Sequence, residues 1–171
     1  EYRNKMEFSF GNAVKDGPLT LGLHKKGSFY DIMEVPECRI VDADFRAVLT
    51  ETLAVCREYG LGFYHKMTHV GYLRHLLVRK AAHTGEMLVD LVTSSQAPED
   101  EAKFLKAFTE RILRSVNKAD SVESAATEVI PDGVRNCAVA GTTDDVASVK
   151  IMKGTIVAVL HTVNDSLSDT I

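Results

Sequence analysis

The sequence lacks several features that would identify a common class of protein. Its three cysteines, at positions 38, 56 and 137 of 171, are too few and too scattered for a disulfide framework. The longest apolar run, residues 156–160, has five residues, whereas a membrane-spanning helix needs about 18 or more. No charged-then-apolar leader pattern opens the chain, so we expect a cytoplasmic protein with no membrane partner.

Positive charge is also scarce overall. Twenty Lys and Arg against 24 Asp and Glu give a net charge of −4, which excludes a globally basic nucleic-acid-binding protein. However, residues 59–85 contain no Asp or Glu, and hold four of the six histidines together with Lys66, Arg74, Arg79 and Lys80. This stretch is either a solvated strand face or a local positive surface for phosphates.

Enzyme motifs are absent or incomplete. Gly22 and Gly27 have the spacing of a phosphate-binding loop, but Ser28-Phe29 stands where Lys-Ser/Thr is required, which favours a hairpin with a basic tip. His65, His69 and His75 lie among glycines that disfavour the helix a metal-binding pair would need. Neither Gly-x-Ser-x-Gly nor Gly-x-Gly-x-x-Gly occurs. The residues alone therefore indicate a binding module.

Hydrophobic periodicity predicts an α+β fold. Strands are expected at residues 2–10, from 19 to the Lys25-Lys26-Gly27 segment, and at 31–35, 73–81, 87–93 and 155–163. One helix is expected between Asp42 as N-cap and Gly60 as C-terminal stop, and a second after Pro98. We expect an antiparallel β-sheet with two main helices packed on one face, in the order β-β-β-α-β-β-α-(insertion)-β.

The domain organisation follows from this order. Residues 1–171 are interpreted as a single domain in which residues 113–154 are a candidate insertion. The first residue is Glu and a strand begins almost at once, which predicts a segment of a longer protein. Cys56 lies on the apolar stripe of the first helix and is expected in the core, while Cys38 follows Pro36 in a loop.

Several ordered segments resemble the RumA-like RNA (uracil-5-)-methyltransferases. They are Tyr2-Arg3-Asn4-Lys5-Met6, residues 21–27, Asp31-Ile32 leading to Glu37-Cys38, Leu73-Arg74-His75-Leu76 through Arg79, residues 86–93 and Val163-Asn164-Asp165. The similarity runs in order from residue 1 to about 112 and resumes near 155. It implies the central domain of a longer enzyme, with an RNA-binding barrel and a cysteine-rich segment before it and a Rossmann-like domain after it.

The resemblance also implies cofactors. Cys38 matches the isolated fourth ligand of the family's four-iron four-sulfur cluster, whose other three ligands would lie before residue 1. The parent enzyme would use S-adenosylmethionine, but the family's glycine-rich cofactor motif and its Ser-Cys-Asn-Pro nucleophile segment are absent from this sequence. We therefore expect neither cofactor bound to this chain and no methyl transfer by it.

The implied partner is RNA, 23S rRNA ahead of transfer RNA, and not DNA. The residues that match the family's RNA-binding cleft are Arg3, Lys5 and Arg79, with Lys25 and Lys26 as weaker candidates. Two alternatives stay open: a stand-alone RNA-binding module, and an unrelated α+β enzyme that holds a small anionic substrate on residues 59–85.

Overall fold

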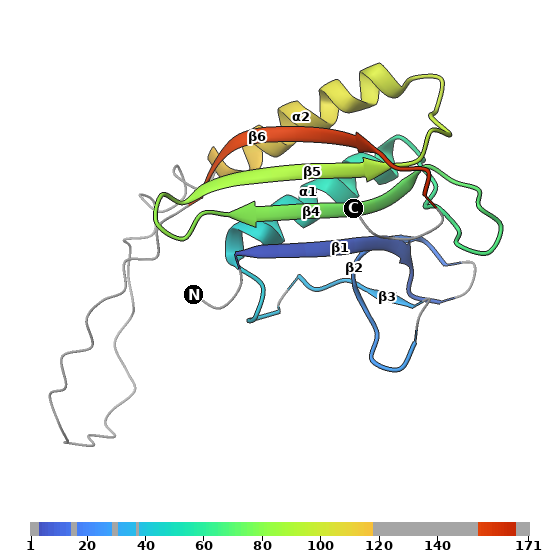
Figure 1. Cartoon of the computed structure of the whole chain (residues 1–171), viewed down its shortest axis with the longest axis horizontal. Helices are drawn as coiled ribbons and strands as arrows, with labels where there is room; N and C mark the ends of the chain where they lie inside the picture. The colour runs from blue at the N-terminus through green and yellow to red at the C-terminus, as the bar shows by residue number, and fades with distance from the viewer. Residues whose placement is uncertain (1–3, 15–16, 29–30, 37, 118–153, 167–171) are drawn as a thin grey trace, which may run out of the picture.

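The computed structural model describes residues 4–14, 17–28, 31–36, 38–117 and 154–166. Within them the elements follow the expected α+β order, which confirms the predicted fold class (Figure 1). The elements are β1 (Lys5–Asn12), β2 (Leu19–His24), β3 (Ile32–Met33), α1 (Ala43–Glu58), β4 (Leu73–Lys80), β5 (Glu86–Thr93), α2 (Glu101–Asn117) and β6 (Thr155–Val163).

The six strands form one sheet in the order β3-β2-β1-β4-β5-β6. Among β1 to β5 every neighbouring pair is antiparallel, as expected, but β6 runs parallel to β5. The sheet is therefore mixed and not wholly antiparallel. The reason is the path of the chain: α2 carries it back along the sheet before β6 begins, and such a crossover joins parallel strands.

Both helices cover the same face of the sheet (Figure 1). The strands present alternate residues to them, such as Met6, Phe8 and Phe10 of β1, all buried. Phe45 and Val48 of α1 are buried on the helix side, and α2 adds Phe104, Phe108 and Ile112. This layer is the hydrophobic core. On the opposite face, which we call the open face, neither of the two described helices lies.

The first helix begins and ends where the sequence predicts. The Asp42 carboxylate accepts a hydrogen bond from the Asp44 backbone N–H at 2.9 Å, which satisfies one of the free donors at the helix start. After the C-cap Tyr59, Gly60 has a φ of 62°, a left-handed conformation that glycine adopts at low cost.

The candidate insertion at residues 113–154 begins within a regular element. Helix α2 continues to Asn117, so the first five of those residues, 113–117, belong to it. Residues 118–153, including Cys137, lie outside the described residues, and so does Arg3. Among the residues that are described, no helix is both long enough and apolar enough to cross a membrane.

Candidate nucleic-acid interface

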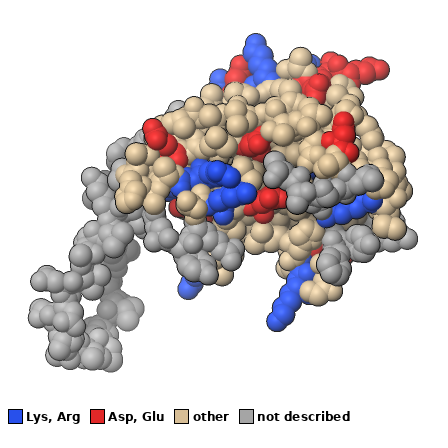
Figure 2. Space-filling view, viewed as in Figure 1, with Lys and Arg blue, Asp and Glu red and all other residues tan. Residues whose placement is uncertain are grey.

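Two predicted RNA-binding residues meet on the open face. Lys5 of β1 and Arg79 of β4 are register partners in the antiparallel ladder, so their side chains lie side by side on one face. Both are exposed and line a shallow groove of about 510 Å³ that also includes Asn4, Glu86 and Leu88. Figure 2 views this face and shows basic side chains gathered over the adjoining ends of β1 and β4. We call this groove the Lys5–Arg79 groove.

The next cation along β4 has a different role. Lys80 points to the helix side, where its Nζ lies 3.0 Å from Asp42 Oδ2 and 2.7 Å from Asp44 Oδ2. Burial lowers the pKa of Lys80, but the hydrogen bonds that its ammonium donates to the two carboxylates outweigh burial, so the pKa lies above its ordinary value. Lys80 is charged and paired inside the fold, and it ties β4 to the start of α1.

The acid-free stretch at residues 59–85 is not a continuous positive surface. Arg74 is buried, and its guanidinium donates to the carbonyl oxygens of Asn164 at 2.6 Å and Ser166 at 2.9 Å. Lys80 is buried as well, which leaves Lys66 and Arg79 as the exposed cations of the four. The hypothesis of a single phosphate-binding surface over this stretch is therefore corrected to two separated positions.

Lys25 and Lys26 lie apart from the Lys5–Arg79 groove. Both are exposed in the turn between β2 and β3, where the Lys25 backbone N–H donates to the Asp31 carbonyl. Figure 1 shows this turn projecting away from the sheet. The structure thus brings Lys5 and Arg79 together, leaves the two turn lysines as a separate basic point, and does not describe Arg3.

The two described cysteines have contrasting surroundings. Cys56 is fully buried in α1, and burial raises the pKa of its thiol to about 12, so it is a protonated core residue as predicted. Cys38 is half-buried in the loop between β3 and α1 and packs against the edge of the core. The described residues contain no group of three or more His, Cys, Asp or Glu side chains placed to hold a metal ion.

The histidines of the acid-free stretch have separate partners. His69 Nδ1 lies 3.1 Å from the Tyr64 hydroxyl, whereas the His75 ring is buried and its Nδ1 lies 3.4 Å from Ser9 Oγ. His24 Nε2 lies 3.3 Å from the same Ser9 oxygen. Sequence reasoning missed this cluster: alternation along residues 2–10 places Ser9 on the outer face, but nothing local shows that His24 and His75 flank it.

Over most or all of its length, the chain is similar to part of several proteins named RNA methyltransferases. It is 41% identical over 171 residues to one from Clostridium tetani, 48% identical over 134 residues to one from Clostridium acetobutylicum, and 36% identical over 170 residues to one from Caldanaerobacter subterraneus. These alignments cover 100%, 78% and 99% of this chain. They cover only 29%, 28% and 29% of the relatives, so the chain spans less than a third of their length.

One solved structure to which part of this chain is similar is that of an enzyme. It is the tRNA (uracil-54, C5)-methyltransferase of Pyrococcus abyssi in complex with S-adenosyl-L-homocysteine, with a TM-score of 0.47 and 20% identity. The match covers 60% of this chain and 24% of that chain. No protein-family model matches the sequence.

Proposed function

We propose that this chain is the RNA-binding central domain of an S-adenosylmethionine-dependent RNA (uracil-5-)-methyltransferase. The observation that supports the proposal is the similarity of all 171 residues to a segment of a protein named an RNA methyltransferase. The proposed substrate is 23S rRNA ahead of transfer RNA, and the proposed location is the cytoplasm. The chain's own task is to bind and position the RNA.

The proposed RNA contact is the Lys5–Arg79 groove. Lys5 and Arg79 are neighbouring cations on an exposed sheet face, so both can neutralise phosphates of one RNA strand. Lys25 and Lys26 are proposed as a second, weaker contact. Arg3 stays a candidate from the sequence alone.

The chemistry of uracil C5 methylation explains why we place methyl transfer outside this chain. Such a reaction needs a thiolate that adds to C6, a base that removes the C5 proton, and a cofactor site. Burial holds Cys56 in its protonated form, and none of the three cysteines, at positions 38, 56 and 137, lies in the family's nucleophile segment. The groups that do the chemistry would therefore come from other parts of the parent protein.

Cys38 remains a proposed ligand of an iron–sulfur cluster in the parent. Its half-buried position at the edge of the core leaves the loop accessible to a further segment, which fits a ligand supplied to a shared site. A four-iron cluster needs about four thiolates. The described part of this chain offers one accessible thiol, so the other ligands would have to be supplied from outside it.

The proposal is tested by RNA affinity. In the 171-residue chain, Lys5→Gln with Arg79→Gln is expected to weaken binding of single-stranded oligouridylate by about tenfold, the effect of two exposed charge contacts. The matched control is Lys103→Gln with Lys106→Gln, which removes the same charge from exposed positions of α2 on the other side of the molecule. Equal losses in both variants would contradict the assignment of the groove.

Methylation assays test the proposal that this chain binds RNA while other parts of the parent protein transfer the methyl group. The parent protein is expected to methylate a uridine-containing RNA with S-adenosylmethionine, whereas the isolated chain is expected to bind the RNA without modifying it. Methyl transfer by the isolated chain would overturn this part of the proposal.

A further inference from the structure

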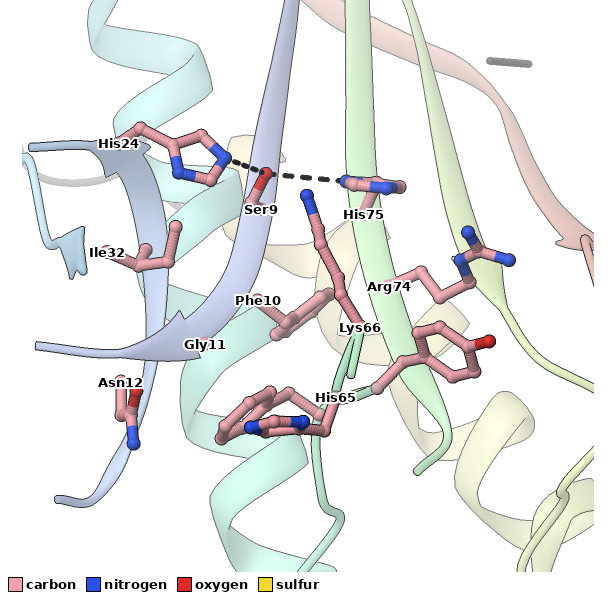
Figure 3. Close-up of a pocket in the computed structure, with 12 residues that line it drawn as sticks. Ser9, Phe10, Gly11, Asn12, His24, Ile32, His65, Lys66, Arg74 and His75 are labelled. Atoms are coloured by element: carbon pink, nitrogen blue, oxygen red, sulfur yellow. Dashed lines mark hydrogen bonds between the residues drawn. The ribbon is translucent and has the colours of Figure 1, made fainter. Parts of the chain in front are cut away.

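A second polar site lies on the open face, at the far end of β1 from the Lys5–Arg79 groove. Lys5, Glu7 and Ser9 alternate along the open face of β1, and Ser9 stands at the entrance of a pocket. The Ser9 hydroxyl lies 3.3 Å from His24 Nε2 and 3.4 Å from His75 Nδ1, as the dashed lines in Figure 3 show. We call this the Ser9 pocket.

The pocket receives a cation from a separate loop. Lys66 belongs to the segment between α1 and β4, and Figure 3 shows its side chain extending toward Ser9 and His75. The loop is held firmly, because its Tyr64 and His65 backbone N–H groups donate to the carbonyls of Leu73 and Val70 at 2.7 and 2.8 Å. The fold therefore holds the backbone of this loop beside the pocket, within reach of the Lys66 side chain.

Two further contacts hold the same loop against the body of the protein. The Gln96 side chain donates to the His69 carbonyl at 2.8 Å and accepts from the Gly71 backbone N–H at 3.0 Å. Gly71 has a φ of 122°, and a Cβ there would collide with the Phe63 carbonyl, so the turn requires glycine. Arg74 closes one side of the pocket, with its guanidinium 4.6 Å from the centre of the Tyr64 ring.

The size and chemistry of the pocket select its ligand. Its volume of about 60 Å³ accommodates a phosphate-sized group or a few waters but not a whole nucleobase. Ser9, His24 and Lys66 come from three segments and bring a hydroxyl, an imidazole and an ammonium group. These groups can donate to an oxyanion with several acceptor oxygens once the 3.3 Å contact between Ser9 and His24 opens. Glu7 is the acidic neighbour of the pocket, with Oε1 3.7 Å from His75 Nδ1.

We propose that the Ser9 pocket binds a phosphate group of an RNA strand that also lies along the Lys5–Arg79 groove. This inference rests on the proposed function, since it adds a second anchor for the same RNA. Ser9 is four residues from Lys5 on β1, a separation of roughly 14 Å at about 3.4 Å per residue. A few nucleotides of one single strand span that distance, so both sites can hold the same molecule.

The test uses the 171-residue chain with Lys66→Gln, His24→Gln and both changes together. The double variant is expected to bind oligouridylate at least fivefold more weakly, while Lys106→Gln on α2 has less than a twofold effect. Inorganic phosphate is expected to shift the ring C–H NMR signals of His24 and His75 and to compete with the RNA. Thermal unfolding of each variant checks that the fold is retained.

The possible outcomes separate the two proposals. Loss of RNA affinity in the Lys5 and Arg79 variants, with no change in the pocket variants, would overturn the Ser9 pocket and leave the proposed function standing. Phosphate shifts without competition by RNA would mean that the pocket takes free phosphate, which also overturns the inference. No RNA binding by any form of the chain would instead count against the proposed function.

Discussion

Arg79 and Lys80 are neighbours in the sequence, yet they serve opposite faces of the sheet. Arg79 is exposed beside Lys5, whereas Lys80 is 7% exposed and bound between the carboxylates of Asp42 and Asp44. Side chains on a strand alternate between faces, so one step along β4 separates a residue available to a ligand from one that holds the fold together. Whether a cation of this chain can meet a ligand therefore depends on the face of the sheet to which its side chain points.

The largest loss of stability is expected from a substitution in the core between the sheet and the two helices. Phe104 is fully buried, and its ring contacts Tyr59 and Tyr72 edge-on at centroid distances of 5.5 and 6.3 Å. Phe104→Ala should lower the free energy of unfolding by about 3–5 kcal/mol in urea titrations. Leu160→Ala on the exposed edge strand should cost less than about 1 kcal/mol, and similar costs for the two would contradict the assignment of faces.

The next largest loss of stability is expected when Lys80 is replaced, and replacement of its neighbour Arg79 is the comparison. Lys80→Met leaves Asp42 and Asp44 without their shared partner and should cost about 2–3 kcal/mol, below the usual cost of breaking a fully buried pair because Asp44 keeps its bond from Gly154. Arg79→Met should change stability by no more than about 0.5 kcal/mol. Chemical denaturation measures both, and equal costs would remove the distinction between the faces.

Titratable side chains buried on the helix-covered side should make the free energy of unfolding fall at alkaline pH. Burial raises the pKa of Cys56 from 9.0 to about 12, so the folded state keeps a proton that the unfolded chain releases above pH 9. The contribution of Cys56 to the free energy of unfolding is therefore fully present below pH 9 and is lost as the pH rises toward 12. The raised pKa values of Tyr72 and Lys80 act in the same direction above about pH 10.

Replacing Cys56 isolates its contribution to the pH dependence of the free energy of unfolding. Between pH 9.5 and 10.5, Cys56→Ala should flatten the decline in the free energy of unfolding by roughly 1 kcal/mol per pH unit. The slopes are compared, and not the absolute stabilities, because the substitution also removes packed atoms. Identical slopes in the two proteins would show that Cys56 ionises as readily in the folded state as in the unfolded chain.

The smallest effect concerns the turn lysines. Lys25→Gln with Lys26→Gln should weaken oligouridylate binding by about twofold, because these exposed side chains project from a turn and attract phosphates mainly through long-range charge. Fluorescence anisotropy at 0.1 M salt resolves this difference. A loss as large as that of the Lys5 and Arg79 double variant would shift the proposed RNA contact toward the β2–β3 turn.

Much of the fold follows from local pattern. Alternation predicted β1 and β2, and the capping chemistry of Asp42 and Gly60 predicted the bounds of α1. The parallel pairing of β6 was missed because strand direction depends on where a long connection returns the chain. The direction of such a strand is set by packing across the sheet, and the sequence of the strand itself carries little signal of it.

The site was less predictable than the fold. Lys5 and Arg79 were proposed together as RNA contacts from the resemblance, but only the β1–β4 register shows that they are neighbours in the sheet. The role of Lys80 had a signal that was overlooked: it follows the buried residues Leu76 and Val78 at a period of two, which assigns it to the core side. The Ser9 pocket joins three distant segments, so sequence alone could not assemble it.

The salt dependence of RNA binding tests the central claim most directly. For oligouridylate, the log–log slope of affinity against salt changes by about 0.7 for each phosphate neutralised on a single strand. The Lys5→Gln and Arg79→Gln double variant should therefore have a slope shallower by about 1.4, while the Lys103 and Lys106 control keeps the slope of the unaltered chain. An unchanged slope in the Lys5 and Arg79 variant would contradict the claim that the open face of the sheet binds RNA.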